Sequence, residues 1–246
     1  MSVHPLASFW AQFDLILCIN LKERQDRRHD IQLVFDRMGI VAQFYTAERH
    51  PISGEIGCFE SHQACMRTAY NAGCNNVLIF EDDGAELTAP TEHMMREIIR
   101  FIKTNTDWDL LFLGGYPSVF FETSKSVPSY THIVKCPSQL THSYAVSRKM
   151  MQKMLRITHS FFNASIDALY LVNKNSYVVQ PTIFYQTDSP SNISAAPRGT
   201  AQIRKVIVQF KNKFSQYSPV PLYSVVIALF VILFLLLLLS LFSRRR

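Results

Sequence analysis

The sequence predicts an α/β protein built around a mainly parallel sheet. Short apolar runs rich in β-branched residues alternate along the chain with longer stretches whose apolar residues recur at helical spacing. The 246 residues are 48% hydrophobic and include only 8 Gly and 11 Pro, which excludes a disordered or collagen-like chain. This length is typical of one globular domain with room for an appendage.

Strands and helices can be assigned in order along the chain. Residues 14–21, DLILCINL, form an apolar run that is typical of a buried strand. The next stretch carries Ile31, Phe35 and Met38 on one helical face, and Gly39 is typical of a helix stop. Further strands are predicted at 41–47, 75–83, 108–115 and 177–186, further helices at 55–72, 91–103, 147–157 and 164–172, and a long loop at 114–138.

The charge of the chain is unevenly distributed. The formal net charge is +6, but eight of the 25 basic residues lie at or after Arg198, where no acidic residue occurs. The first 197 residues therefore carry 17 basic against 19 acidic side chains. Because this part of the chain is not basic, we expect no nucleic-acid partner.

The basic residues near the C-terminus flank an apolar segment. No charged residue occurs from Phe214 to Ser243, and a helix over 220–242 spans about 34 Å, enough to cross a hydrocarbon core of about 30 Å. Apolar residues on every helical face argue against a buried core helix. We expect a globular domain at 14–198, a basic amphipathic linker at 199–219 and a transmembrane helix at 220–242.

This segment predicts a single-pass, tail-anchored membrane protein. The N-terminus has neither the basic region nor the continuous apolar stretch of a secretory signal. The five cysteines show no paired CxxC spacing and fit free thiols in a reducing compartment. The flank before the apolar segment holds five basic residues and the flank after it three, a bias that places the globular domain in the cytoplasm.

Three acidic residues follow the apolar run Val77–Phe80. Because side chains alternate faces along a strand, Glu81 and Asp83 are expected to point the same way, on either side of Asp82. Neighbouring carboxylates repel one another unless a cation or hydrogen-bond donors neutralise them. A hard divalent ion with oxygen ligands suits such a cluster, and a solvated acidic turn is the alternative.

Basic residues follow the first predicted strand. Arg24, Arg27 and Arg28 lie near the expected start of a helix, where backbone N–H groups and the helix dipole favour a phosphate group. Arginine adds bidentate phosphate contacts. A solvated basic helix face is the alternative. This cluster and the acidic one both follow strands, and ligands of parallel sheets bind beyond the carboxyl ends of the strands.

A third group lies on one face of the helix predicted at 55–72. Cys58, His62 and Cys65 recur at helical spacing, and as metal ligands they would lack a fourth member. The favoured interpretation is a packed face with two buried thiols. His62 is the exception, because a helix beside a cleft can direct it at a ligand.

Together these segments resemble glycosyltransferase family 25. INLKERQDRR (19–28), GEIGCFESH (54–62) and VLIFEDD (77–83) occur in the order and spacing of that family, which includes bacterial lipooligosaccharide galactosyltransferases and collagen galactosyltransferases. Looser similarity extends through WDLLFLGG, THSYAVSRKMMQKML, SIDALYL and QPTIFYQTDSPSNIS, so the resemblance covers residues 14–198.

The resemblance implies a GT-A-like nucleotide-sugar fold and inverting transfer of galactose or glucose from a UDP-sugar to an acceptor hydroxyl. The acidic triplet stands where GT-A enzymes carry their DxD motif, so Asp83 and Glu81 are implied as ligands of Mn²⁺ or Mg²⁺, with Glu81 or Asp82 contacting the ribose or metal-bound water. Metal neutralises charge on a leaving diphosphate. The implied nucleotide-sugar contacts are Asn20, Arg24, Arg27, His62 and Asp82.

Inversion also requires a general base within hydrogen-bond reach of the acceptor hydroxyl. Asp167, in SIDALYL, is the lone acid there and matches an Asp of the family. Its alternative is a helix N-cap or first-turn acid. Asp109 and Asp188 are weaker candidates, and Gln186 is expected near the donor or acceptor.

Two rival functions stay open. The final motif has Asn192 where the family carries Asp, which allows a catalytically inactive relative that serves as a membrane-tethered binding or scaffold protein. The other rival is a metal-dependent phosphohydrolase, which would hydrolyse a UDP-sugar without any acceptor. The intact acidic triplet argues against the scaffold.

Overall fold

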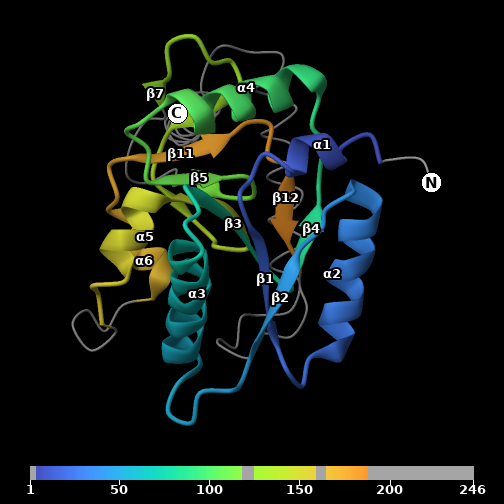
Figure 1. Ribbon diagram of the computed structural model, residues 1–246, viewed down its shortest axis with the longest axis vertical. Helices are drawn as coiled ribbons and strands as arrows, with labels where there is room; N and C mark the ends of the chain where they lie inside the picture. The colour runs from blue at the N-terminus through green and yellow to red at the C-terminus, as the bar shows by residue number, and fades with distance from the viewer. Residues whose placement is uncertain (1–3, 118–124, 159–164, 188–246) are drawn as a thin grey trace, which may run out of the picture.

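An eight-stranded sheet with helices on both faces organises the chain (Figure 1). The computed structural model describes residues 4–117, 125–158 and 165–187. The helices are α1 (Ala7–Trp10), α2 (Gln25–Met38), α3 (Gly54–Asn71), α4 (Glu92–Thr104), α5 (Arg148–Met154) and α6 (Ile166–Leu171). The strands are β1 (Ile16–Leu21), β2 (Gln43–Ala47), β3 (Asn76–Glu81), β4 (Gly84–Glu86), β5 (Leu110–Phe112), β6 (Tyr116–Pro117), β7 (Lys125–Ser126), β8 (Ile133–Lys135), β9 (Ser138–Gln139), β10 (Ser143–Ser147), β11 (Ser176–Val179) and β12 (Phe184–Gln186).

The strands of the large sheet follow the order β2-β1-β3-β10-β5-β11-β8-β7. β1 is parallel to β2 and β3, and β5 is parallel to β11. β10 is antiparallel to both β3 and β5, so those two strands share one direction. Only β10 and β8 oppose the other six, which confirms the predicted α/β class and the mainly parallel sheet.

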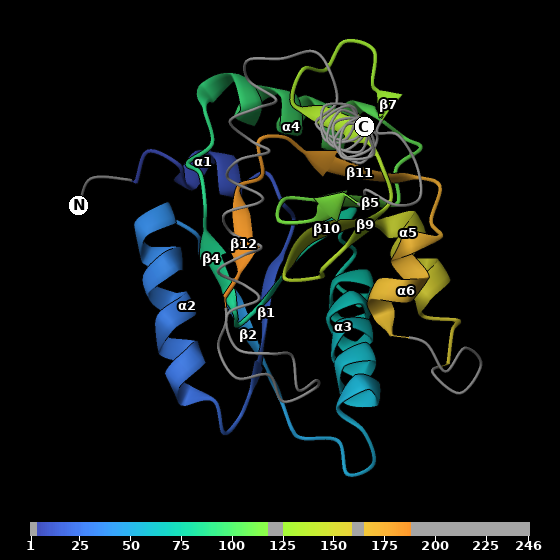
Figure 2. The ribbon, with the colours of Figure 1, turned by 180° about the vertical axis from the view of Figure 1, so that it is seen from behind.

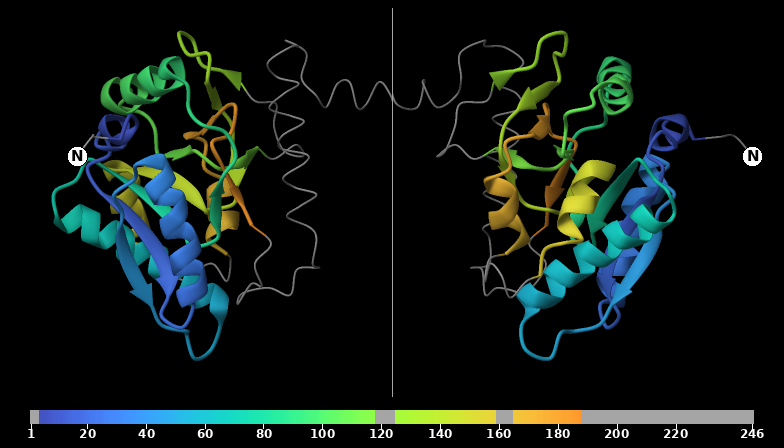
Figure 3. Two further views of the ribbon diagram at one scale, coloured as in Figure 1. Left: turned by 90° about the vertical axis from the view of Figure 1, so that its right-hand side faces the viewer. Right: turned by 60° about the vertical axis from the view of Figure 1, so that its left-hand side comes forward.

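Helices α2 and α4 cover one face of the sheet, and α3, α5 and α6 cover the other (Figures 1 and 2). Figure 3 shows these layers from two further directions. The alternation along β3 explains why there are two cores. Leu78 and Phe80 pack under α2, whereas Val77 and Ile79 pack under α3. Both faces of the strand are buried, so its central residues Val77–Phe80 are all apolar.

Helix ends follow the local sequence. Ser53 is the N-cap of α3, and its side chain accepts a hydrogen bond from the Glu55 backbone N–H. Thr91 and Ser147 cap α4 and α5 in the same way. Gly39 ends α2 with a φ of 66°, the left-handed conformation that its lack of a Cβ permits, so the predicted helix stop is confirmed.

Several short strands were not predicted. The stretch 114–138, expected as a loop, contains β6, β7, β8 and part of β9. β10 lies at 143–147, directly before α5, and β4 follows the acidic triplet and pairs antiparallel with β12, which lies within the strand predicted at 177–186. These strands are two to five residues long. Except for β7 and β8, which pair with each other over about ten residues, their partners are distant in sequence, and such short strands show no local periodicity.

Within the described ranges, no helix is long and apolar enough to cross a membrane. The predicted transmembrane helix at 220–242 and the predicted linker at 199–219 lie outside those ranges. The same holds for Asp188 and Asn192. The membrane anchor therefore stays a prediction.

Candidate active site

A cleft of about 120 Å³ opens at the carboxyl ends of β1, β2 and β3. This is the edge at which parallel sheets bind ligands. Strand ends supply its floor, and the first turns of α3 supply one wall. The lining residues are Ile19, Leu21, Arg27, Ala47, Glu48, Arg49, His50, Gly54, Gly57, Cys58, Ser61, His62, Glu81, Asp82, Asp83 and Gln186.

The predicted nucleotide contacts on β1 and α2 meet Asp82. Arg27 Nη1 donates to Asp82 Oδ1 at 2.9 Å, and Asn20 Nδ2 donates to Asp82 Oδ2 at 2.8 Å. Asn20 is fully buried and lies behind the lining, where it also donates to the backbone oxygen of Arg24. Asp82 is therefore held from two sides by residues 55 and 62 positions away in sequence.

Asp83 is buried and only partly neutralised. Arg27 Nη1 lies 3.6 Å from Asp83 Oδ2, and Gln186 Nε2 donates to the same oxygen at 3.1 Å. The other oxygen, Oδ1, is buried and has no hydrogen-bond partner among the described residues. Burial, with the charges of Glu81 and Asp82 adding to it, raises the pKa of Asp83 to about 7.

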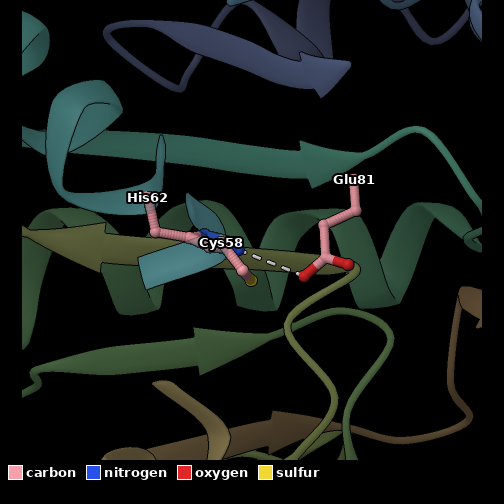
Figure 4. Close-up of side chains that lie close together, drawn as sticks. All are labelled: Cys58, His62 and Glu81. Carbon is pink, nitrogen blue, oxygen red and sulfur yellow. Dashed lines mark hydrogen bonds and ion pairs between the residues drawn. The ribbon is translucent and has the colours of Figure 1, made fainter. Parts of the chain in front are cut away.

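Glu81 faces the opposite side from Asp83. Its Oε1 lies 3.1 Å from His62 Nε2 and accepts a hydrogen bond from Thr141 Oγ1 at 2.6 Å. The close-up shows the His62 ring directed at this carboxylate, with Cys58 beside it (Figure 4). Burial acts to raise the pKa of Glu81, but the bonds and charge of His62, with the Thr141 bond, outweigh burial and lower it.

The expected alternation between Glu81 and Asp83 does not continue through the triplet. β3 ends at Glu81, and the two residues that follow belong to a turn. Glu81 keeps the direction that the strand dictates, toward α3, whereas Asp83 turns to α2 and β12. The triplet is thus one acidic cluster with two differently directed ends.

A buried polar chain continues from Glu81 through His62. The hydroxyl of Tyr144 lies 2.8 Å from His62 Nδ1, and the hydroxyl of Tyr170 lies 3.3 Å from that of Tyr144. Burial raises the pKa values of both tyrosines, so both stay neutral. Both nitrogens of His62 are therefore occupied, and its ring orientation is fixed.

Asp167 lies in the first turn of α6 and is not its N-cap. That role belongs to Ser165, whose Oγ accepts from the Ala168 N–H at 3.3 Å. Burial, with the Glu81 carboxylate adding to it, raises the pKa of Asp167 to about 6. Its Oδ1 is buried and has no hydrogen-bond partner among the described residues. The structure thus brings Asp167 into the electrostatic reach of Glu81 and His62.

Arg24 is placed differently from the other predicted contacts. Its guanidinium pairs with Asp26, with Nη2 2.8 Å from Oδ2, and Arg24 is not among the residues that line the cleft. Asp109, a weaker candidate for the base, lies just before β5. It is therefore at the amino ends of the parallel strands, opposite the ends that form the cleft. Cys65 is fully buried in the core beneath α3, apart from Cys58 and His62.

Sequence reasoning missed two groups of this site. Thr141 and Tyr144 lie in and beside β10, whose existence was not predicted, and they hold Glu81 and His62. Arg49 and His50 line the cleft from the loop after β2. The one feature of the sequence that could have indicated them is that they directly follow the strand predicted at 41–47.

The acidic cluster fits a divalent cation. Asp82 and Asp83 share one arginine, Arg27, whereas Glu81 is held by His62 and Thr141. Oδ1 of Asp83 offers a buried oxygen without a protein donor. Oxygen ligands of this kind suit Mn²⁺ or Mg²⁺. Glu81 also belongs to a second possible ligand set with Cys58 and His62, whose ligand atoms lie within 4.8 Å of one another.

Comparison with known proteins matches a region that contains part of the cleft. The sequence profile described as Glycosyltransferase family 25 (LPS biosynthesis protein) matches residues 48–170, which is half of the chain. The matched region contains His62, the acidic triplet and Asp167.

The chain is also similar to curated proteins and to solved structures. It is 27% identical over 171 residues to procollagen galactosyltransferase 2 of Mus musculus, covering 58% of this chain and 27% of that protein. It is 24% identical over 214 residues to procollagen galactosyltransferase 2 of Homo sapiens, covering 75% of this chain and 34% of that protein. The chain thus spans about a third or less of the length of these relatives.

One solved structure is a glycosyltransferase involved in the glycosylation of the major capsid of PBCV-1, with 10% identity, a TM-score of 0.42, and coverage of 78% of this chain and 99% of that chain. Another is a putative glucose-1-phosphate thymidylyltransferase from Bacillus anthracis, with 12% identity, a TM-score of 0.43, and coverage of 89% and 87%.

Proposed function

Because this chain belongs to glycosyltransferase family 25, we propose that it transfers a hexose, galactose or glucose, from a UDP-sugar to an acceptor hydroxyl with inversion at the anomeric carbon. The proposal includes a GT-A-like mode of donor binding and dependence on Mn²⁺ or Mg²⁺. The observation that carries it is the incompletely neutralised carboxylate of Asp83, buried at the ligand-binding edge of the sheet.

The donor is proposed to lie along the ends of β1, β2 and β3. The apolar side chains of Ile19, Leu21 and Ala47 offer a surface for the nucleoside, and Arg27 and Arg49 offer positive charge for the diphosphate. Asn20 acts from behind the lining, because it fixes the orientation of Asp82. Arg24 is proposed to support this site from its edge.

Asp83, together with Glu81, is proposed to hold the divalent ion, which requires the Glu81 carboxylate to turn from His62 toward Asp83. When bound, such an ion neutralises the charge that develops on the leaving diphosphate. Ionised Asp83 is disfavoured in the metal-free cleft, because burial and two neighbouring carboxylates raise its pKa. A site that keeps one carboxylate under-compensated gains affinity for a cation at that position.

Asp167 is proposed as the general base. Its raised pKa of about 6 brings it near the operating pH that suits proton transfer while leaving it mostly ionised above neutrality. Oδ1 of Asp167, which lacks a partner within the described ranges, would accept the proton of the acceptor hydroxyl. His62 is a positioning residue in this scheme, because it holds Glu81 and is itself held by Tyr144.

The test is donor binding by the purified chain. A panel of nucleotide sugars is titrated by calorimetry with and without Mn²⁺, alongside Asp83→Asn and the matched control Asp109→Asn. We expect tight binding of a UDP-hexose that needs Mn²⁺, is lost in Asp83→Asn and is kept in Asp109→Asn. Absence of any metal-dependent binding would favour the inactive scaffold, and UDP release without an acceptor would favour the phosphohydrolase.

We propose further that residues 220–242 anchor the enzyme in a membrane, with residues 14–198 in the cytoplasm. The support is the charge-free apolar run and the basic bias of its flanks. The sequons at Asn163 and Asn192 provide the measurement, since only a luminal domain is glycosylated. We expect no glycosidase-sensitive mass shift. A shift that disappears in the Asn163→Gln, Asn192→Gln double variant would reverse the orientation.

A further inference from the structure

A second group of metal-ligating side chains lies away from the cleft, on α4 and the segment before β8. His93 and Glu97 are one helical turn apart on α4, and His132 comes from the segment that leads into β8. Their ligand atoms all lie within 4.8 Å of one another. None of the three lines the cleft, and α4 lies at the top of the view in Figures 1 and 2, well above α3.

We propose that His93, Glu97 and His132 bind a zinc ion that joins α4 to the start of β8. The two histidine nitrogens, both Nδ1, lie 3.3 Å apart, and His132 Nδ1 lies 3.0 Å from Glu97 Oε2. Ligand atoms about 2.0–2.1 Å from a tetrahedral zinc ion are separated by about 3.3 Å, so the observed spacing needs little adjustment. Two imidazoles and one carboxylate form a donor set that zinc favours.

The hydrogen bonding at this point supports the assignment. His132 Nδ1 can donate one proton, and Glu97 Oε2 accepts it. His93 Nδ1 faces the same nitrogen and then serves as an acceptor. Two ring nitrogens and one carboxylate oxygen thus lie close together, and His93 Nε2 also lies 3.9 Å from Glu97 Oε1. A zinc ion that replaces the His132 proton would be bound by His93, His132 and Glu97.

The surroundings hold the ligands in place before any ion arrives. Glu97 is buried, and its carboxylate accepts from the backbone N–H groups of Thr131 and His132. The guanidinium of Arg100 lies over the Tyr130 ring, 4.4 Å from its centroid, and Arg100 also donates to the Ser129 backbone oxygen. Glu97 and the 129–132 segment are therefore fixed to each other, as a preformed metal site requires.

The site is also open to solvent. The His93 side chain is 56% exposed, so an ion can enter from that side, and three protein ligands leave a fourth position for water. Because β8 pairs with β11, an ion there would hold α4 against the outer half of the sheet. This inference stands apart from the proposed transfer reaction, because it involves none of the residues assigned to it.

The experiment uses the full chain purified in a mild detergent. Zinc content is measured by elemental analysis, affinity by competition with a chromophoric chelator, and geometry by the visible spectrum of the Co²⁺ form. Variants are His93→Ala and His132→Ala, with His29→Ala as the control because His29 is an exposed histidine of α2. All are repeated in a background that carries both Asp83→Asn and Cys58→Ala, so that zinc bound at the cleft is counted separately.

We expect the parent and His29→Ala to bind one equivalent of zinc more than His93→Ala, in both backgrounds. Loss of a ligand should weaken binding by at least about 100-fold, since loss of a residue that merely orients a ligand weakens it by 10–100-fold. The Co²⁺ form should show tetrahedral absorption that His93→Ala removes. Equal zinc affinity in the parent and in folded His93→Ala, or no zinc in the parent, would overturn the proposal.

Discussion

Two buried carboxylates of the same sheet, Asp83 and Asp109, differ in how they are neutralised. Asp109 precedes β5 and has two lysines, with Lys153 Nζ 2.8 Å and Lys149 Nζ 3.3 Å from its oxygens. Asn173 Nδ2 adds a hydrogen bond at 3.2 Å. Asp83 follows β3 and shares a single arginine with Asp82, while Glu81 lies beside both.

We propose that this difference separates a structural acid, Asp109, from a functional one, Asp83. Asp109 draws its cations from the chain, so its position is satisfied by folding alone. Asp83 shares one arginine with Asp82 and gains a proton more readily than an ordinary carboxyl group, although Oδ1 of both Asp83 and Asp109 lacks a hydrogen-bond donor within the described ranges. Burial alone therefore does not mark an active-site acid, whereas burial without enough compensating charge does.

The largest expected effect tests this distinction through activity. Asp83→Asn should lower sugar transfer by more than about 10³-fold, because the isosteric amide removes the charge that would hold a catalytic cation. Asp109→Asn should change the rate of transfer less than about threefold, since Asp109 lies at the amino ends of the strands, away from the cleft. Initial rates with saturating Mn²⁺ provide the measurement. Comparable losses in both variants would erase the distinction.

The next effect extends the comparison to Asp167, which also has an unpartnered buried oxygen within the described part of the chain. Asp167→Asn should lower turnover by about 10²–10⁴-fold, the usual contribution of a general base. The Kd of the donor should change little, because the proposed role concerns the acceptor. A stability loss with preserved turnover would instead make Asp167 a structural acid of α6, like Asp109.

Asp83→Asn has the larger expected effect on activity, whereas Asp109→Asn should have the larger effect on stability. Asp109→Asn should lower the free energy of unfolding by about 1–3 kcal/mol, because two lysines lose a buried partner. Asp83→Asn should leave it unchanged or raise it in metal-free protein at pH 8, since it removes one of three mutually repelling carboxylates. Urea unfolding of both variants decides the matter, and a large loss in Asp83→Asn would contradict the assignment.

The last prediction concerns the pH dependence of stability. The pKa of Asp83 in the folded protein is about 7, above the unfolded value of about 3.9, so folding favours the protonated form between these values. The free energy of unfolding should therefore fall as pH rises from about 4 to about 7, by at most about 1.4 kcal/mol per pH unit from this group. Asp167 contributes with the same sign up to about pH 6.

Metal-free thermal melts in chelator at several pH values provide this measurement. Asp83→Asn should reduce the fall of stability with rising pH, whereas Asp109→Asn should leave that fall unchanged. Added Mn²⁺ should raise Tm more at pH 8 than at pH 6, because proton and cation compete for the same oxygen. A Tm rise from Mn²⁺ that is independent of pH would exclude Asp83 as the ligand.

The parallel core of the fold could be predicted from the sequence, because its elements are indicated by patterns of neighbouring residues. The strands β1 and β3 are continuous apolar runs, and α2 ends at a glycine. Such patterns are visible within one window of the chain. β10 is central to the sheet, yet its sequence SYAVS contains two serines, and it was not predicted. Its partners β3 and β5 are more than thirty residues away.

The candidate site divides in the same way. Groups of functional side chains that are consecutive in the chain, such as the acidic triplet, could be recognised in the sequence. The directions of Glu81 and Asp83 were not, because they depend on where β3 ends. Thr141 and Tyr144 could not be predicted as supports, since their contacts with Glu81 and His62 span 60 and 82 positions. Only the folded chain brings such residues together.

The pairing of β12 with β4 has a consequence for how the protein is made. Gln186 reaches Asp83 across 103 positions, and the Thr187 N–H donates to the Asp83 backbone oxygen. A ribosome delivers the chain from its N-terminus, so β1 to β3 emerge long before β12. The acidic turn therefore lacks its hydrogen bond from Gln186 until nearly all of the described chain has been synthesised. Biosynthetic order itself therefore keeps the cleft incomplete on any nascent fragment that ends before Gln186.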